Sequence, residues 1–335
     1  MSIMSESDPE FSILIVAYDR REYILDAVNS ALSQEFDHGR YEIIVIKNYT
    51  DEGIDRYLKE HHIRNIYSEE TALGAKFVEG ARSAKGKYLC LLEDDDRFVP
   101  GKLSAISGLA EDGTIFIHNS YLKSADEIGE REYPEVISMD AGNFKLTKLL
   151  EFTHYNASFN CSSITVERDI IINNKDVIRN LTYHLDSFLY LASLGHEKGK
   201  ITHVNQPLTI FRSHDDSVLK DFDNFVSRRL SRSLSVLNEM EAYRISLQDK
   251  IPRFLLVGDM LYVNSVVKLL GKEPVIRKLT AFDYLAGLFP WPPAKTYLFK
   301  IKTIVLSFLP ARLKSHFLRS LYNSTKERYK QLDRQ

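Results

Sequence analysis

The first hundred residues alternate between short apolar runs and segments whose apolar residues recur with the period of a helix. The strand-like runs are "FSILIVAY" (11–18), "YEIIVIKN" (41–48), the short "IRNIYS" (63–68) and "KYLCLL" (87–92). Helical spacing separates them, from Arg21 to "FDHGR", over 53–62 and from Gly74 to near "AKGK". Continuous runs suit strands that are buried on both faces of a parallel sheet. The alternation predicts a doubly wound α/β sheet with right-handed crossovers.

The pattern changes in the second half of the chain. "GTIFIHNSYL" (113–122) and "SSITVERDI" (162–170) have the composition of strands, and 143–152 and 184–194 have the period of helices. From about Asp221 nearly every segment is helical in period. We therefore predict two domains, an α/β domain over 1–220 and a helical region over 221–335.

Four consecutive carboxylates, Glu93, Asp94, Asp95 and Asp96, follow the run at 87–92 directly. Like charges at this spacing repel one another, so such a cluster is typical of a place where a cation binds. In doubly wound sheets, ligands bind beyond the carboxyl ends of the strands, which is where this cluster falls. The alternative is an acidic loop that is simply hydrated.

Composition argues against some classes of protein. The formal net charge of −2 gives no sign of nucleic-acid binding, and the apolar runs are shorter than the roughly 18 residues of a spanning helix. Two cysteines and an acidic, polar N-terminus predict a cytoplasmic protein with reduced thiols.

The C-terminal segment is strongly basic. From Pro292 to Gln335 ten Lys or Arg residues stand against Glu327 and Asp333, close to Trp291 and several phenylalanines. Basic amphipathic helices with aromatic residues lie on membrane surfaces, so we predict a peripheral protein on the cytoplasmic face of a membrane. The alternative is a helical cap that packs on the α/β domain or on a second subunit of a homo-oligomer.

Five segments in order resemble the family 2 glycosyltransferases with the GT-A fold. They are "FSILIVAYDRREYILDAVNSALSQ", "YEIIVI", "GKYLCLLEDDDRFVPGKL", "YHLDSFLYLASLG" and "TIFRSHDDS", and they span residues 11–217. The resemblance implies a mixed, mainly parallel sheet flanked by helices. It also implies an inverting enzyme that uses a nucleotide-diphosphate sugar of the UDP or GDP type together with Mn²⁺ or Mg²⁺.

The resemblance assigns roles within the acidic cluster and on the acceptor side. Asp95 matches the metal ligand, and Glu93 or Asp94 matches a contact to ribose or to a metal-bound water. Asp186 matches the general base that takes the proton of the acceptor hydroxyl, although Leu185 stands where the family has Glu. The other interpretation of Asp186 is a charge that stabilises the first turn of a helix.

Further positions match the donor site of the family. Arg212 and His214 correspond to an Arg-x-His segment over the diphosphate, in which the His adds a metal ligand in some members; the alternative for His214 is an ordinary loop histidine. The nucleotide edge corresponds to Ala17, Tyr18 and Asp19, with Arg20 or Arg21 just beyond and Gly74 at the start of the third helix.

Two departures bear on specificity. Lys47 and Asn48 replace the paired aspartates that family members carry after the second strand, and Val78 replaces an Asn in the third helix. Asn48 could still bind a base edge, and Lys47 could pair with a phosphate. The leading interpretation is transfer of a sugar to a glycan or a polyprenyl-linked acceptor. A catalytically silent scaffold that binds nucleotide sugar and a phosphohydrolase are the alternatives; the motifs that a phosphohydrolase needs are not found.

Overall fold

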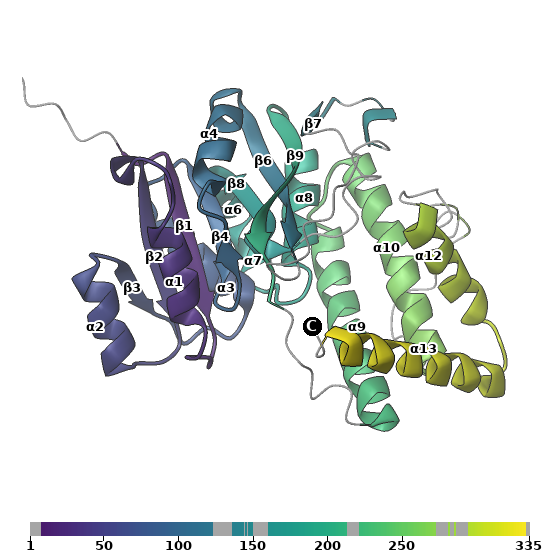
Figure 1. The fold of residues 1–335 in the computed structure, drawn as a ribbon. Helices are drawn as coiled ribbons and strands as arrows, with labels where there is room; N and C mark the ends of the chain where they lie inside the picture. The colour runs from purple at the N-terminus through teal and green to yellow at the C-terminus, as the bar shows by residue number, and fades with distance from the viewer. Residues whose placement is uncertain are drawn as a thin grey trace, which may run out of the picture. The chain divides into compact units, whose positions relative to one another are not determined.

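The computed structural model describes residues 8–122, 136–143, 145, 147–149, 160–212, 221–272, 281, 285 and 294–332. The chain divides into two compact units, Met1–Arg212 and Ser213–Gln335. The first unit contains the sheet and the acidic cluster, and the second is made of helices (Figure 1).

The first unit is built on one mixed sheet, with the strand order β3-β2-β1-β4-β8-β6-β9-β5. Four strands at one side are parallel: β1 (Phe11–Ala17), β2 (Tyr41–Lys47), β3 (Arg64–Tyr67) and β4 (Tyr88–Glu93). The other strands are β5 (Arg97–Phe98), β6 (Thr114–Leu122), β7 (Val136–Asp140), β8 (Ile164–Glu167) and β9 (Lys200–Ile210). Strand β8 runs antiparallel between β4 and β6, whereas β6 and β9 are parallel. The short strands β5 and β7 both pair antiparallel with β9.

Helices cover this sheet because its central strands have apolar side chains on both faces. Every residue of β1 is buried, and Ile13, Ile15 and Ala17 pack in a cluster with Ala27 and Val28 of α1. The helices are α1 (Ile24–Leu32), α2 (Glu52–Glu60), α3 (Leu73–Ser83), α4 (Lys102–Glu111), α6 (Arg168–Asn173), α7 (Lys175–Ile178) and α8 (Leu185–Leu194), with short 3-10 turns η1 (His38–Arg40) and η2 (Cys161–Ser163). The carboxyl ends of β1, β2 and β4 therefore meet at one edge of the sheet, as the alternation predicts.

The structure corrects the predicted elements in two places. The strand predicted over 162–170 ends at Glu167, and α6 begins at Arg168 because Ile170 and Ile171 bury one side of a helix. Strand β9 was not predicted, since "KITHVNQPLTI" contains polar residues and Pro207. The helix predicted over 143–152 lies mostly outside the described residues.

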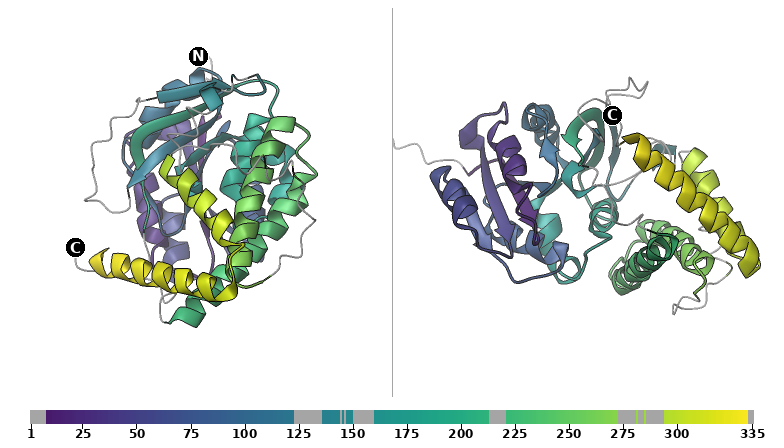
Figure 2. Two further views of the ribbon diagram at one scale, coloured as in Figure 1. Left: turned by 90° about the vertical axis from the view of Figure 1, so that its right-hand side faces the viewer. Right: turned by 60° about the horizontal axis from the view of Figure 1, so that its bottom comes forward.

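The second unit is helical, as its sequence period predicts. Its long helices are α9 (Phe222–Arg244), α10 (Lys250–Leu269), α12 (Ala294–Leu306) and α13 (Ala311–Leu332). Helix α10 packs against both α9 and α12. Helix α13 crosses the N-terminal end of α9, where the Tyr322 ring lies against Phe222 and Phe225 (Figure 2). Among the described helices, none combines the length and the apolar composition that crossing a bilayer requires.

Candidate active site

The acidic cluster lies in the turn that follows β4. Ligand oxygens of Glu93, Asp95 and Asp96 come within 4.8 Å of one another. The turn is closed by a hydrogen bond of 3.2 Å from the backbone N–H of Asp96 to the carbonyl oxygen of Glu93. Asp94 and Asp96 are almost completely buried. Three carboxylates thus converge at the sheet edge where a ligand is expected.

Burial and mutual repulsion shift the acidity of this cluster. Burial, followed by the charges of Asp96 and Asp95, raises the pKa of Glu93 to about 8. Burial also raises the pKa of Asp94 to about 6 and that of Asp96 to about 6. Each charged form is therefore costly unless a cation lies close.

A cation from the chain itself contacts the cluster. The guanidinium of Arg20 forms ion pairs with both Asp94 and Asp95. The neighbouring Arg21 points elsewhere, with its guanidinium carbon 4.6 Å from the ring centroid of Tyr49 and its Nε 3.6 Å from Asp51. Sequence reasoning named Arg21 as the donor-site residue and left Arg20 as its alternative. The structure brings Arg20, not Arg21, to the carboxylates.

The ends of β1 and β2 are tied together by Asp19 and Asn48. The backbone N–H of Asp19 donates to Asn48 Oδ1 at 2.9 Å, and Asn48 Nδ2 donates to Asp19 Oδ1 at 2.8 Å. Asp19 has a φ of +56°, a left-handed conformation that Asp tolerates better than most residues. The pair thus fixes the loop that carries Arg20. Ala17, at the end of β1, is fully buried.

Tyr18 and Lys47 differ in whether their side chains are exposed to bind a nucleotide. Tyr18 is exposed, and Lys76 Nζ lies 4.8 Å from its ring centroid. Lys47 is buried, donates to the carbonyl oxygen of Tyr49 at 2.5 Å and pairs with Asp55 at 2.7 Å. The phosphate contact considered for Lys47 is therefore wrong, because its ammonium group holds β2 to the start of α2.

Gly74 has a packing role in the structure. Its N–H donates to the carbonyl oxygen of Leu181 at 2.8 Å, and a Cβ atom at this position would lie 1.9 Å from the carbonyl oxygen of Ile178. Only glycine allows this close approach. Its predicted contact with the donor would have to be made by the backbone.

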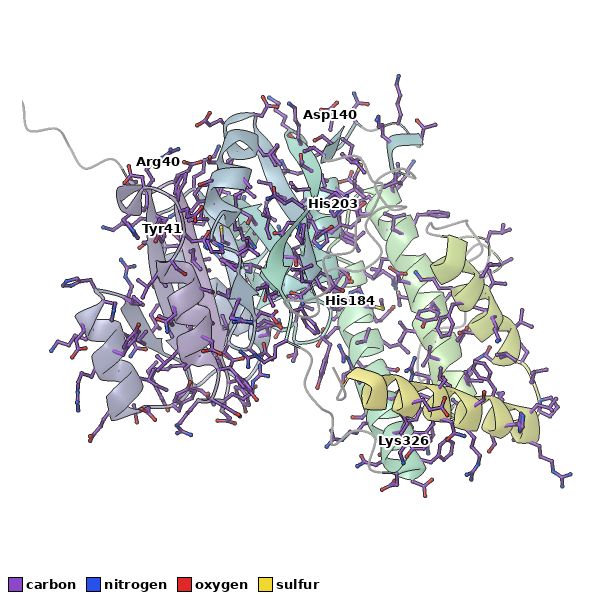
Figure 3. The ribbon with its side chains drawn as sticks, viewed as in Figure 1. Arg40, Tyr41, Asp140, His184, His203 and Lys326 are labelled. Carbon is purple, nitrogen blue, oxygen red and sulfur yellow. The ribbon has the colours of Figure 1, made fainter. Side chains whose placement is uncertain are left out.

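The acceptor-side residue Asp186 lies in the first turn of α8, two residues after the N-cap His184 (Figure 3). Its Oδ1 accepts a hydrogen bond of 2.6 Å from the N–H of Ser187. The charge of Asp186 contributes to the raised pKa of Glu93, after burial and the charges of Asp96 and Asp95, so the two carboxylates share one electrostatic environment. Leu185, which replaces the family's Glu, is buried. Asp186, on a helix about 90 residues later in the chain, thus acts electrostatically on Glu93 of the cluster.

Arg212 closes the cluster from the end of β9. Its backbone N–H donates to Asp96 Oδ1 at 3.0 Å, and its Nε donates to the carbonyl oxygen of Asp95 at 3.1 Å. Its Nη2 pairs with Asp26 at 2.6 Å, and its guanidinium carbon lies 4.2 Å from the ring centroid of Tyr23. The structure therefore brings Arg212 to the predicted site. His214 lies outside the described residues.

A buried lysine that was not predicted from the sequence is linked to the cluster by hydrogen bonds through Ser162. Lys102 is fully buried, and its Nζ donates to the carbonyl oxygen of Ser162 at 2.8 Å and to Thr209 Oγ1 at 3.3 Å. Burial lowers its pKa to about 7. Ser162 Oγ in turn accepts the N–H of Glu93 at 3.0 Å. The network joins α4, η2 and β9 to the cluster. In the sequence, the one sign of this buried lysine is its place at the start of the mainly apolar segment "KLSAISGLA".

The cluster fits a hard divalent cation. Asp94 Oδ2 and Asp96 Oδ2 are buried oxygens with no hydrogen-bond donor among the described residues. Closely spaced carboxylate oxygens are the ligands that Mg²⁺ and Mn²⁺ prefer. A bound cation would provide these carboxylate oxygens with a positively charged partner.

Comparison with known proteins shows what the region around this site is similar to. The model for glycosyl transferase family 2 matches residues 12–171, which include the strands β1 to β4 and the cluster. Over 142 residues the chain is 29% identical to an uncharacterized glycosyltransferase of Rickettsia bellii, covering 41% of this chain and 20% of that protein. The chain thus spans about a fifth of the length of this curated relative. The predicted family resemblance is confirmed for the matched segment.

Solved structures share the fold. The mannosyltransferase PcManGT of Pyrobaculum calidifontis, in complex with GDP-Man and Mn²⁺, superposes with a TM-score of 0.51 at 11% identity, covering 90% of this chain and 86% of that one. S. aureus TarS 1-349 in complex with UDP-GlcNAc gives a TM-score of 0.50 at 11% identity, covering 93% and 92%. At this identity the likeness concerns the fold, and it confirms the predicted GT-A architecture.

Proposed function

We propose that this chain, whose residues 12–171 match the model for glycosyl transferase family 2, is an inverting, metal-dependent glycosyltransferase. It moves a sugar from a nucleotide-diphosphate sugar to a glycan or polyprenyl-linked acceptor at the cytoplasmic face of a membrane. The observation that carries the proposal is the convergence of Glu93, Asp95 and Asp96 at the end of β4, with the charge of Asp186 acting on the same group.

Asp95, with Glu93 and Asp96 beside it, would hold Mn²⁺ or Mg²⁺. The buried oxygens of Asp94 and Asp96 that lack donors support this assignment. A bound divalent cation neutralises the negative charge that grows on a departing diphosphate. The backbone of Arg212 holds Asp96 in place from the other side, so the cluster is positioned before the cation arrives.

Asp186 is the proposed general base. Its carboxylate accepts the N–H of Ser187, and a carboxylate can take the proton of an acceptor hydroxyl. The hydroxyl oxygen of the acceptor then attacks the anomeric carbon from the face opposite the diphosphate. The bond to the diphosphate breaks, and the configuration is inverted. The position of Asp186 in the first turn of α8 stabilises its charged, basic form.

Donor recognition is assigned to the arginines and to the edge of β1 and β2. The guanidiniums of Arg20 and Arg212 lie beside the acidic cluster, where diphosphate oxygens would be held; a guanidinium suits such oxygens. Asn48 and the exposed Tyr18 are proposed to contact the nucleobase, and His214 is proposed as a further contact to the diphosphate or the metal. The neighbouring folds include one solved with UDP-GlcNAc and one with GDP-Man, so both nucleotides are candidates.

Calorimetric titration of the full chain with UDP, GDP, UDP-GlcNAc and GDP-Man, with and without Mn²⁺, tests the proposal. We expect one nucleotide family to bind, and to bind more tightly with Mn²⁺. Release of the nucleoside diphosphate from the matching sugar donor should then be measurable. Binding of a nucleotide sugar without any turnover, over a panel of lipid-linked and glycan acceptors, would favour the scaffold interpretation instead.

A further inference from the structure

Helix α12 is apolar on the face that it turns to solvent. Leu298 is 65% exposed, Val305 is 58% exposed, and Phe308, in the turn after the helix, is 62% exposed. Leu313, near the start of α13, is 54% exposed. These four side chains are called here the apolar row. Leu298 and Val305 are seven residues apart, which places them on one side of the helix.

The opposite side of α12 already has its packing partner. Thr303, Ile304 and Ser307 are buried, and Lys300 pairs with Asp259 of α10 at 2.6 Å. A surface helix that packs one side on a protein core normally presents polar side chains on the other. The apolar row is therefore not explained by the packing of the second unit, and its exposure indicates a binding surface.

Positive charge surrounds the apolar row. From residue 294 to residue 326 the sequence contains no Asp or Glu, while the basic residues are Lys295, Lys300, Lys302, Arg312, Lys314, Arg319 and Lys326. Lys302 is exposed between Leu298 and Val305, with its Nζ 5.3 Å from the ring centroid of Phe317 on α13, and Arg312 is exposed beside Leu313. Lys268 Nζ lies 5.7 Å from the ring centroid of Phe308. The complementary partner must accept apolar side chains and supply negative charge within the same surface.

Because exposed apolar side chains and basic residues share this surface, we infer that the apolar row is a membrane-binding surface. Helix α12 would lie in the headgroup region of an anionic bilayer. The apolar side chains would enter the boundary between headgroups and acyl chains, by about 5–10 Å. Lys302 and Arg312 would extend to lipid phosphates, as long basic side chains do at such interfaces. The inference names the surface by which the chain would reach the membrane of the proposed function, and it does not depend on the transferase activity itself.

The position of Lys302 argues against a second protein as the partner. Cores of protein–protein interfaces are depleted in lysine, because its ammonium group would lose water without gaining a full set of acceptors. Here the lysine stands within the apolar row itself. At a bilayer the same arrangement is favourable, since the stem stays in the apolar layer while the ammonium group remains hydrated.

The test uses the full chain in flotation assays with two kinds of vesicle, phosphatidylcholine alone and phosphatidylcholine mixed with phosphatidylglycerol. We expect binding to the anionic vesicles, weakened by added salt. Replacing Val305 and Phe308 together by Ser should lower the partition coefficient at least about tenfold, because both side chains lose apolar burial. Replacing Lys302 and Arg312 together by Gln should reduce binding to the anionic vesicles and weaken its salt dependence.

Ile245→Ser is the matched control. Ile245 is 78% exposed, but it precedes the N-terminal end of α10, whereas Lys268 beside Phe308 is at the other end of this helix, about 30 Å away. The control should bind vesicles like the wild type. All of these side chains are exposed, so thermal unfolding should change little; this measurement confirms that each variant is folded.

Three outcomes would overturn the inference. One is a wild-type chain that floats with neither kind of vesicle. Another is a Val305/Phe308 variant that floats as well as the wild type. The third is a wild-type dimer in light scattering that becomes a monomer when Val305 and Phe308 are replaced, which would assign the apolar row to contact between copies. Calorimetry with nucleotide sugar, run on the same variants, reports separately on the proposed activity.

Discussion

The guanidinium of Arg20 lies in ion-pair contact with the carboxylate of Asp95, the residue that we propose as a metal ligand. The same guanidinium pairs with Asp94, so one side chain partly neutralises the buried cluster. The chain therefore provides its own counter-charge at the place where a divalent cation would bind. A metal that binds Asp95 has to compete with Arg20, and the released guanidinium would then be free to hold a diphosphate oxygen.

Competition of this kind predicts opposite effects of Arg20→Gln on two ligands. Without nucleotide, Mn²⁺ should bind more tightly, by about tenfold, because a positive charge beside its ligands is removed. The nucleotide sugar should bind more weakly, since a partner for the diphosphate is lost. Both affinities can be measured by calorimetry.

Arg21→Gln is the control for that experiment. Arg21 is the adjacent residue in the chain, yet its guanidinium lies over the Tyr49 ring. Its replacement should leave the affinity for Mn²⁺ unchanged. If both variants lose Mn²⁺ affinity together, the arginines organise the loop and Arg20 does not compete with the cation.

Asp95→Asn should remove the dependence of donor binding on Mn²⁺. An amide keeps the shape of the carboxylate and loses its charge, so the cation loses its proposed ligand while repulsion within the cluster decreases. We expect a small change in the thermal unfolding midpoint without metal, because the variant also loses the ion pair with Arg20. Glu111→Gln, which changes an exposed carboxylate at the end of α4, is the control. Turnover at the wild-type rate in saturating Mn²⁺ would remove Asp95 from the metal site.

Asp186→Asn separates catalysis from helix stabilisation. The amide oxygen can still accept the N–H of Ser187, so donor affinity and the unfolding midpoint should change little. Turnover should decrease by roughly 10²-fold or more, because an amide cannot take the acceptor's proton. Asp169→Asn changes an equivalent first-turn acid of α6 and should not affect turnover. A parallel loss of donor binding and turnover would indicate a structural role for Asp186.

The predictable part of this chain is the part encoded by neighbouring residues. The β1 to β4 region was predicted because its strands are continuous apolar runs and its helices have apolar residues at helical spacing. The acidic cluster was predicted because its carboxylates are consecutive. The rest depends on contacts between distant segments. Lys102 bonds to Ser162 and Thr209, which lie 60 and 107 residues away. Likewise, the choice between Arg20 and Arg21 depends on the left-handed turn at Asp19. No local pattern specifies such pairings.

Two buried histidines should make the free energy of unfolding depend on pH. His118 of β6 and His203 of β9 are paired in register, with Nδ1 atoms 3.1 Å apart. Burial lowers the pKa of His203 to about 4 and that of His118 well below its usual range. Both are therefore neutral in the folded chain at pH 5, where the unfolded chain, with a histidine pKa of about 6.5, is mostly protonated.

Because the unfolded state binds more protons between pH 6.5 and about 4, the free energy of unfolding should decrease as pH falls through that window. Each histidine contributes up to about 1.4 kcal/mol per pH unit. Urea unfolding of the wild type and of His203→Asn at pH 7.5 and pH 5 measures the effect. The carboxylates of the site titrate in both proteins, so the difference between the two isolates this histidine, and the variant should lose less stability on acidification. His61→Gln, at an exposed histidine after α2, should behave like the wild type. Equal losses in the wild type and in His203→Asn would contradict a neutral, buried pair.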